Sequence, residues 1–347
     1  MAKTKNMVYY LLKRVLIMVP ILLLVLVAAF TLTTFMSQKV LNIAGLIPFE
    51  QMEVEKARTG YYDPWFIKVA KYFGNFFTGN WGTSHIVSNN VPVTRLLAQI
   101  FPKTMEIVII PIIVIPILGV KLGVVSAKNR NRMKDTVIRG GVMLAVCIPS
   151  FWLATMIQYF FGTIMTNWTY GAINVEVMNP NSVTMRYDPI TGFRLIDAFL
   201  LNDQILLHDT LLHIYIPCMC LVIITFAGIT RQTRASMLEV MRKDYIRTAR
   251  AKGVPDKDVT NKHTLRNGLI PTSTAIIGTT AGLLTGSLFI EMAFNYTGMG
   301  FYMIRAMTGG DYVVINGILV FSSIIIMIGT LSADILYTII DPRIVYS

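Results

Sequence analysis

The sequence predicts an all-α integral membrane protein with six spanning helices. Of the 347 residues, 54% are hydrophobic and only 14% are charged, whereas a soluble domain carries about 25% charged residues. The mean hydropathy of +0.58 agrees with this deficit of charge. Six apolar stretches also reach the length of roughly 20 residues that a helix needs to cross a bilayer.

The first predicted span has no charged residue and follows Lys13 and Arg14. It is too long for the apolar core of a signal peptide, and no A-x-A cleavage site follows, so we expect it to be retained. In the third span, Pro149 predicts a kink. The predicted spans are residues 15–35, 107–127, 140–168, 211–230, 269–290 and 312–333.

Basic residues predict which loops face the cytoplasm. The N-terminal tail, residues 1–14, has four Lys or Arg residues, loop 128–139 has five, and loop 231–268 has ten. The outer loops hold few basic residues or, in the first case, exceed the roughly 60 residues over which this rule holds. We therefore expect a multi-pass protein of the cytoplasmic membrane with both termini in the cytoplasm. The predicted outer loops are residues 36–106, 169–210 and 291–311.

This asymmetry accounts for most of the net charge of +12, so no nucleic acid is needed as a partner to explain it. Membrane lipid is the expected surrounding of the chain. Within the first outer loop, residues 64–77 have near-helical apolar spacing. This spacing predicts a helix packed against the outer face of the bundle.

Loop 231–268 predicts two helices. Its first part has apolar residues at 3–4-residue spacing with basic residues between them, so we expect one amphipathic helix with a basic face. Gly253, followed by Pro255, predicts where this helix ends. A second polar helix is expected over 256–267. The apolar residues of the first helix are Met237, Leu238, Met241, Tyr245 and Ala249.

Residues 245–253 read Tyr-Ile-Arg-Thr-Ala-Arg-Ala-Lys-Gly, and His263 and Pro271 follow at fixed distances. This order resembles the cytoplasmic signature of ABC-importer permeases, and of their peptide branch in particular. The broader signature has Glu-Ala where this chain has Arg247-Thr248. Further matches to the family are residues 80–84, 102–106 and 291–300 (with Thr297 where Pro is usual), Asp311, Asp334 and 341–344. The long first outer loop and the Asp-Pro-Arg ending resemble the B-type subunit.

The resemblance implies the type I ABC importer permease fold, as a single domain over residues 15–347. It implies a second, non-identical permease subunit, two cytoplasmic ATPase subunits, an external substrate-binding protein and a peptide substrate. The segment at 245–252 would be the coupling helix, with its apolar stripe in an ATPase groove and its basic residues orienting it. The residues implied in coupling are Tyr245, Arg247, Thr248, Ala249, Arg250, Ala251, Lys252 and Gly253.

Nothing in the sequence points to an enzyme. No G-x-x-x-x-G-K-[ST] run is present, so the chain lacks a P-loop. ATP and Mg would therefore be bound by the partner ATPases, and we expect no cofactor and no metal in this chain. The four histidines are scattered, and the three cysteines lie in apolar stretches.

The sequence indicates the residues of the translocation path less specifically than those of the coupling helix. Thr280, Ser287 and Glu291 are candidates because small and polar groups suit a wide peptide path, and acids near span ends invite a functional hypothesis. Small residues in a span also mediate close helix packing. Glu106 and Asp334 are further acids near span ends that are equally open to a paired or solvated role.

Other functions stay open at this point. Within ABC importers, the substrate could be a nickel chelate or a glutathione-like molecule instead of a peptide. An ion-gradient-driven secondary transporter is a second alternative, although no inverted repeat is visible and charge is scarce in mid-span. A non-transporting anchor or sensor is a third. Loop 169–210 is a candidate docking surface for the external binding protein.

Overall fold

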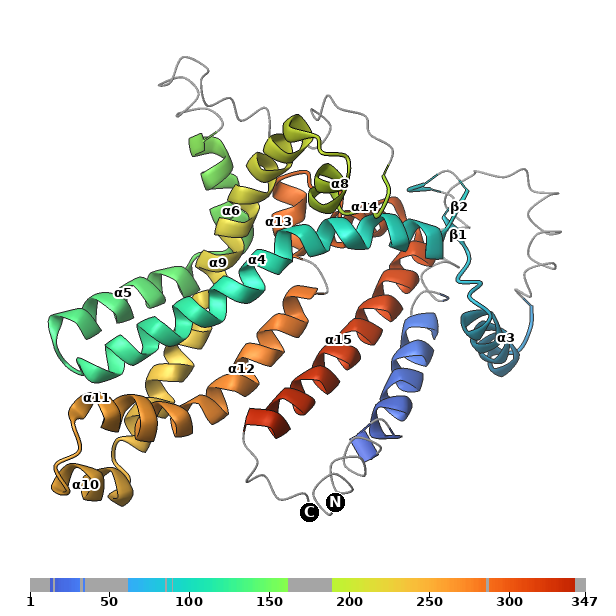
Figure 1. The fold of residues 1–347 in the computed structure, drawn as a ribbon. Coiled ribbons are helices and arrows are strands. Elements are labelled where there is room, and N and C mark those ends of the chain that lie inside the picture. The colour runs from blue at the N-terminus through green and yellow to red at the C-terminus, as the bar shows by residue number, and fades with distance from the viewer. Residues whose placement is uncertain are drawn as a thin grey trace.

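The described part of the protein is mostly helical in its computed structural model (Figure 1). The structure describes residues 13–14, 16–31, 34, 62–84, 86–88, 90–161, 189–284 and 287–340, with only the backbone for 333–340. Most of the N-terminal tail, residues 35–61, residues 162–188 and the ending 341–347 lie outside these ranges. The family matches at 341–344 therefore stay predictions.

Four stretches of the described chain are long and apolar enough to cross a membrane. They are Val93–Lys128 (α4), Gln204–Val240 (α9), Asp256–Ala293, which contains α12 (Arg266–Leu284), and Tyr312–Ser332 within α15 (Tyr312–Ile340). A further helix, Leu16–Thr31, is apolar but shorter over its described residues. A multi-span helical protein is therefore confirmed, while the count of six spans stays a prediction.

The third predicted span is two helices, α5 (Met133–Cys147) and α6 (Ser150–Tyr159), which bend by 97° relative to each other. Pro149 lies at the bend, as predicted, because proline lacks an N–H and its ring obstructs the preceding helical turn. The helix begins at Met133 and not at the predicted residue 140. Residues 162–168 of this predicted span lie outside the described residues.

The first part of α4 corrects the predicted outer loop 36–106, because residues 93–106 are helical. This part buries only one side, with Val93, Leu97 and Ile100 in a core shared with α14 (Met299–Gly309) and α15. A search for continuous apolar runs misses such a helix, because its other side is polar.

The fifth predicted span, 269–290, is not one continuous helix. α12 ends at Leu284, Ser287 has a non-helical backbone, and the short helix α13 (Leu288–Ala293) follows. α13 packs against α6 and α14. The chain thus leaves the direction of α12 to build the end of the molecule opposite α10, which is the outer end in the predicted orientation.

The outer end also contains α3 (Trp65–Phe77), which matches the predicted helix over 64–77. A two-stranded antiparallel sheet, β1 (Thr83–Ser84) with β2 (Val91–Pro92), precedes α4. Helix α8 (Arg194–Leu200) lies beside α9. Figure 1 shows α8, α13 and α14 at one end of the long helices and α10 and α11 at the other.

Candidate functional site

The predicted coupling helix is α10, Asp244–Ala251. α9 continues to Val240, and a short turn separates it from α10. The prediction of one amphipathic helix that includes both Met237 and Ala249 is therefore wrong. Met237 lies in α9 and packs against Gly268 of α12, whereas Ala249 faces the segment that follows α10. Apolar spacing alone does not reveal a turn of this length.

The apolar side of α10 is covered by the chain itself. Ile246 and Ala249 are buried together with Val259, and Val240 and Val254 pack at the edge of this cluster. The sequence analysis placed an apolar stripe that includes Tyr245 and Ala249 in the groove of a partner. Ala249 instead lies in this internal cluster with Ile246, whereas Tyr245 is exposed. The cluster fixes α10 to its own chain, so a partner would meet the opposite side of the helix.

That opposite side is basic and carries one aromatic ring. Tyr245 is 47% exposed, and the side chains of Arg247 and Arg250 are 75% and 54% exposed. Thr248 and Lys252 are exposed as well. Arg247 lies 3.4 Å from the Asp244 carboxylate and Arg250 lies 3.9 Å from that of Asp256. Both pairs are exposed, and such surface pairs contribute little to stability. Their charge therefore remains accessible to a partner.

Gly253 ends the helix as predicted, with a φ of 77° in the left-handed region. No atom lies within 4 Å of the place where a Cβ would be, so backbone conformation and not space demands glycine here. The amide of Gly253 donates to the Arg250 carbonyl at 2.9 Å, and that of Val254 donates to the Ala249 carbonyl at 3.2 Å. The chain reverses within these residues.

The second predicted helix, 256–267, exists but does not end at 267. α11 (Asp256–Asp258), the π-helix η3 (Val259–Leu265) and α12 follow one another without a break. The Thr264 hydroxyl donates to the Val259 carbonyl at 3.0 Å, the spacing of the wider π turn. We call residues 241–265 the coupling module. It continues directly into α12 and is joined to α9 by one turn.

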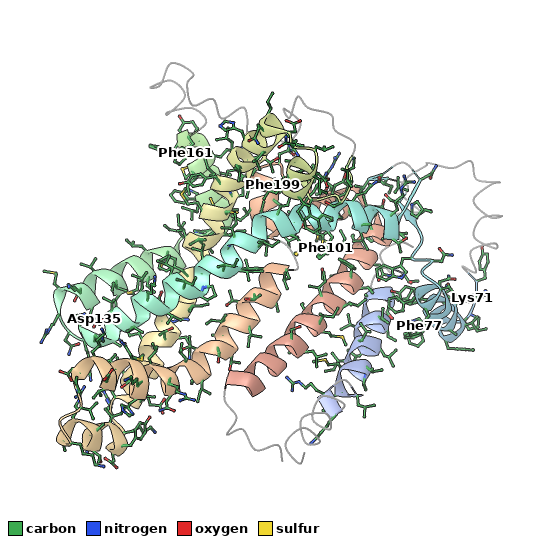
Figure 2. All side chains as sticks on the ribbon, viewed as in Figure 1. Lys71, Phe77, Phe101, Asp135, Phe161 and Phe199 are labelled. Carbon is green, nitrogen blue, oxygen red and sulfur yellow. The ribbon has the colours of Figure 1, made fainter. Side chains whose placement is uncertain are left out.

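A buried ion pair lies where α9 approaches this module. Arg234 donates from Nε and Nη2 to the two carboxylate oxygens of Asp135, each at 2.8 Å. Ser126 Oγ donates to Asp135 at 2.5 Å, and the Asn131 amide at 3.0 Å. Asp135 is fully buried and lies near the turn between α4 and α5 (Figure 2). We call these four residues the inner latch, which joins α4, α5 and α9.

Next to the inner latch, α4 and α9 also pack closely against each other. A Cβ added at Gly119 would lie 2.7 Å from Ile229 Cγ2, and one added at Gly123 would lie 2.5 Å from Thr233 Cβ. Glycines four residues apart let two helices in a membrane approach closely. α4 and α9 are therefore fixed to each other by direct contact and also through Asp135 of α5, which Ser126 and Arg234 both bind.

At the outer end, Glu291 is fully buried and caps α14 from outside that helix. Its Oε2 accepts hydrogen bonds from the amides of Gly300 at 2.8 Å and Phe301 at 3.2 Å, and Thr104 Oγ1 donates to its Oε1 at 3.2 Å. Thr104 in turn accepts from the Met299 amide at 2.7 Å. Three amides in the first turn of α14, which have no partner within the helix, are satisfied in this way.

Glu106, two residues after Thr104 on α4, has a similar role. Its Oε1 accepts from the Leu195 amide in α8 at 2.8 Å, and its Oε2 accepts from the Tyr296 hydroxyl at 3.0 Å. Burial, and then the adjacent carboxylate, raise the pKa of Tyr296, so its hydroxyl stays a donor. We call Thr104, Glu106, Glu291 and Tyr296 the outer carboxylate cluster. It ties α4 to α8, α13 and α14.

This arrangement bears on the three candidates for the translocation path. In this structure Glu291 faces protein donors and has no exposed surface. Thr280 and Ser287 are half-buried on the same segment of chain and stay candidates. The side chain of Asp334 lies outside the described residues.

Two further motif segments meet although they lie far apart in the sequence. Ser84 Oγ donates to Asp311 Oδ2 at 2.7 Å, and the amides of Ile86 and Val87 donate to the same oxygen at 3.2 Å. The sequence analysis noted both segments as family matches but did not pair them. Asp311 thus fastens the sheet region to the start of α15.

Comparison with known proteins gives the family. Residues 119–346 match the family described as binding-protein-dependent transport system inner membrane component. The chain belongs to this family. It is 31% identical to the oligopeptide transport system permease protein AppB of Bacillus subtilis, over 98% of this chain and 100% of that protein. It is 33% identical to the dipeptide transport system permease proteins DppB of Alkalihalophilus pseudofirmus (98% and 100% covered) and of Lactococcus lactis (97% and 99%).

Family membership confirms the resemblance noted in the sequence. It disfavours the secondary transporter and the non-transporting anchor, since the family is one of transport systems that depend on a binding protein. The matched residues contain the coupling module and all four residues of the inner latch. The sequence analysis missed Asp135 and Arg234. Asp135 could have been noticed as the one acid in the basic loop 128–139, but nothing marks Arg234 among ten basic residues.

Proposed function

We propose that this chain is the B-type permease subunit of an ATP-driven importer that moves peptides across the cytoplasmic membrane. The coupling module carries this proposal, because it presents Tyr245, Arg247 and Arg250 on a helix that is fixed to two spanning helices. The names of its relatives support a peptide as the substrate.

The partners follow from the same proposal. A second, non-identical permease subunit would complete the pathway, an external binding protein would deliver the peptide, and two ATPase subunits would bind ATP and Mg. The chain is then a transport component and not an enzyme. The coupling module would lie in the cytoplasm with both termini, and α3, α8 and α14 would lie on the outer side.

In this proposal the coupling module transmits force as a rigid piece. An ATPase subunit would bind the exposed basic side of α10, for which charge complementarity gives orientation. The buried Ile246 cluster would prevent α10 from rolling when the ATPases close. Movement would pass through the turn at 241–243 into α9 and through η3 into α12. The inner latch would carry it on to α4, and the spans would rock between inward- and outward-open states.

The experiment that tests the proposal reverses charge on the exposed side of α10. We expect Arg247→Glu with Arg250→Glu to lower uptake and co-purification of the ATPase by about 10-fold or more, since losing such contacts costs at least 1.4 kcal/mol. Insertion and the thermal midpoint should stay unchanged, because both side chains are exposed. The measurements are peptide uptake, ATPase pull-down and thermal unfolding in detergent.

Arg132→Glu with Lys134→Glu is the matched control, since it makes the same change of charge on exposed residues of the neighbouring basic loop. This control should retain binding of the ATPase. Uptake at the normal rate in the Arg247/Arg250 variant would contradict the coupling assignment. Competition of peptide uptake by nickel chelates or glutathione would instead redirect the substrate and leave coupling intact.

A further inference from the structure

Helix α3 has an inward side that anchors it to two other helices. Tyr72 stacks on Phe30 with 4.8 Å between ring centroids, and its hydroxyl donates to Asn316 Oδ1 at 3.0 Å. Phe76 stacks on Trp81 with centroids 5.3 Å apart. These contacts fix α3 to the helix Leu16–Thr31 and to the first part of α15.

A second side of α3 is apolar and uncovered. Phe66 is 67% exposed and Phe77 is 74% exposed. Ala70 and Ile67 are exposed on the same part of the helical surface, which the 100° step per residue places away from Tyr72. Two phenylalanines left in water would forgo about 1.5–3 kcal/mol each. This side therefore calls for an apolar partner.

A third side of α3 is polar. It carries Lys68, Lys71 and Asn75, and Lys71 forms an ion pair with Asp63 just before the helix. Figure 2 shows Lys71 and Phe77 projecting from different sides of the helix. A helix with one side on protein, one apolar side and one polar side suits a boundary between lipid and water.

The depth of α3 along the bundle agrees with such a boundary. α15 begins at Tyr312, directly after Asp311, and its sequence is apolar from the first turn onward. The start of α15 therefore marks one surface of the hydrocarbon. Asn316 and Val320, against which α3 packs, lie about 6 and 12 Å inside it. Interfacial helices bury their apolar side by about 5–10 Å.

The direction of α3 also agrees with a position at the boundary between lipid and water. Figure 1 views α3 close to end-on, whereas α15 and the helix over 16–31 run in the plane of the picture. α3 therefore crosses the spanning helices and does not extend their direction. At its N-terminal end, Tyr62 and Trp65 are exposed, and these two residue types are enriched at membrane–water interfaces.

From these observations we propose that α3 is an interfacial helix whose exposed apolar side, Phe66, Ile67, Ala70 and Phe77, is covered by acyl chains of the outer leaflet. Its lysine side faces the headgroups and water. The partner is lipid, and α3 anchors the outer loop at a fixed depth. The proposal depends on the chain spanning a membrane and is independent of the transported substrate.

Spin labels at single cysteines test it in the assembled importer in lipid nanodiscs. The background carries Cys147→Ser, Cys218→Ala and Cys220→Ala, because Cys147 is exposed. Labels at Phe66→Cys, Ala70→Cys and Phe77→Cys should collide more often with oxygen, which dissolves in lipid, than with a water-soluble nickel chelate. The matched control, Asn75→Cys on the polar side of the same helix, should show the reverse preference.

Two outcomes would overturn the proposal. A preference for the nickel chelate at Phe66→Cys and Phe77→Cys would place this side in water. Protection of both labels from both reagents would mean that a protein subunit covers it. Ala70→Cys is the smallest change of the three. If either phenylalanine variant fails to assemble, the label at residue 70 shows whether this side of α3 lies in lipid, in water or against protein.

Discussion

At the scale of single residues, buried carboxylates fix the outer end of this protein. Glu291 of α13 binds two first-turn amides of α14, and Glu106 of α4 binds a first-turn amide of α8 that lies 89 residues further along the chain. A buried amide without a partner costs about 1–3 kcal/mol, so each carboxylate both satisfies and positions a helix. A Cβ added at Gly298 would lie 2.5 Å from Glu291 Oε2, and one added at Gly300 would lie 3.1 Å from Glu291 Cδ, so glycine at both positions leaves room for this carboxylate.

Gly300→Ala tests this close approach. A Cβ at this position would lie 2.9 Å from Leu288 Cα and 3.0 Å from Leu288 N, and backbone atoms cannot rotate away. We expect a loss of about 1–3 kcal/mol, the usual cost of overpacking, and a lower thermal midpoint in detergent. Gly278→Ala is the control, since nothing lies within 4 Å of its added Cβ and alanine favours helix. Equal midpoints for the two variants would contradict the role of Gly300.

At the scale of elements, the inner latch decides which helices move together. α9 and α12 both leave the coupling module, and Arg234 connects α9 to the turn between α4 and α5 through Asp135. The buried cluster of Ile246 makes α10 part of this unit and not a separate docking peptide. In the proposed mechanism, coupling would therefore depend on these buried contacts as well as on the exposed side of α10.

A double-mutant cycle tests the latch. Asp135→Ala and Arg234→Ala should each lower stability by about 1.5–3 kcal/mol, because hydrogen bonds to charged groups are lost and one charge is left unpaired. The double variant should lose less than the sum of the two, with a coupling energy of about 0.5–3 kcal/mol. Thermal unfolding of the purified complex measures all three.

The control for this cycle is Lys134→Ala, an exposed neighbour of Asp135 that should change stability by less than about 0.5 kcal/mol. Strictly additive losses for Asp135 and Arg234 would show that the pair contributes no interaction energy. Arg234→Lys is informative as well, because lysine cannot form the bidentate contact.

At the scale of the whole molecule, the coupling module and the outer carboxylate cluster lie at opposite ends of the same long helices (Figure 1). α4 and α9 each extend from one end to the other and contact both the inner latch and the outer helices. A movement imposed at α10 therefore has a continuous path to the opposite end of the molecule. The proposed import driven from the α10 end would use this path.

At this scale we predict that ATP, and not the membrane potential, drives uptake. In proteoliposomes that contain the complete importer and internal ATP, collapse of the membrane potential should leave peptide uptake unchanged. Replacing ATP by a non-hydrolysable analogue should abolish it. Arrest by loss of the potential alone would restore the secondary transporter as the better hypothesis.

Much of this organisation could be predicted from the sequence. The apolar runs located helices at every predicted span that falls on described residues, Pro149 marked the bend, and Gly253 marked the end of α10. The predicted start of a helix was wrong where the helix is amphipathic. Residues 93–106 of α4, for example, lie before the predicted span. The same limitation merged α9 with α10, because a short turn hardly disturbs the apolar spacing.

The sequence by itself determined the membrane-spanning class, the asymmetry of charge and the signature at Tyr245–Gly253. These depend on composition and on residues adjacent in the chain. Only the tertiary structure decided that the stripe of α10 faces inward, that Arg234 pairs with Asp135, and that Glu291 caps α14. Asp135 and Arg234 lie 99 residues apart, and the other two contacts join segments on either side of a helix end. Each depends on packing, which no local pattern encodes.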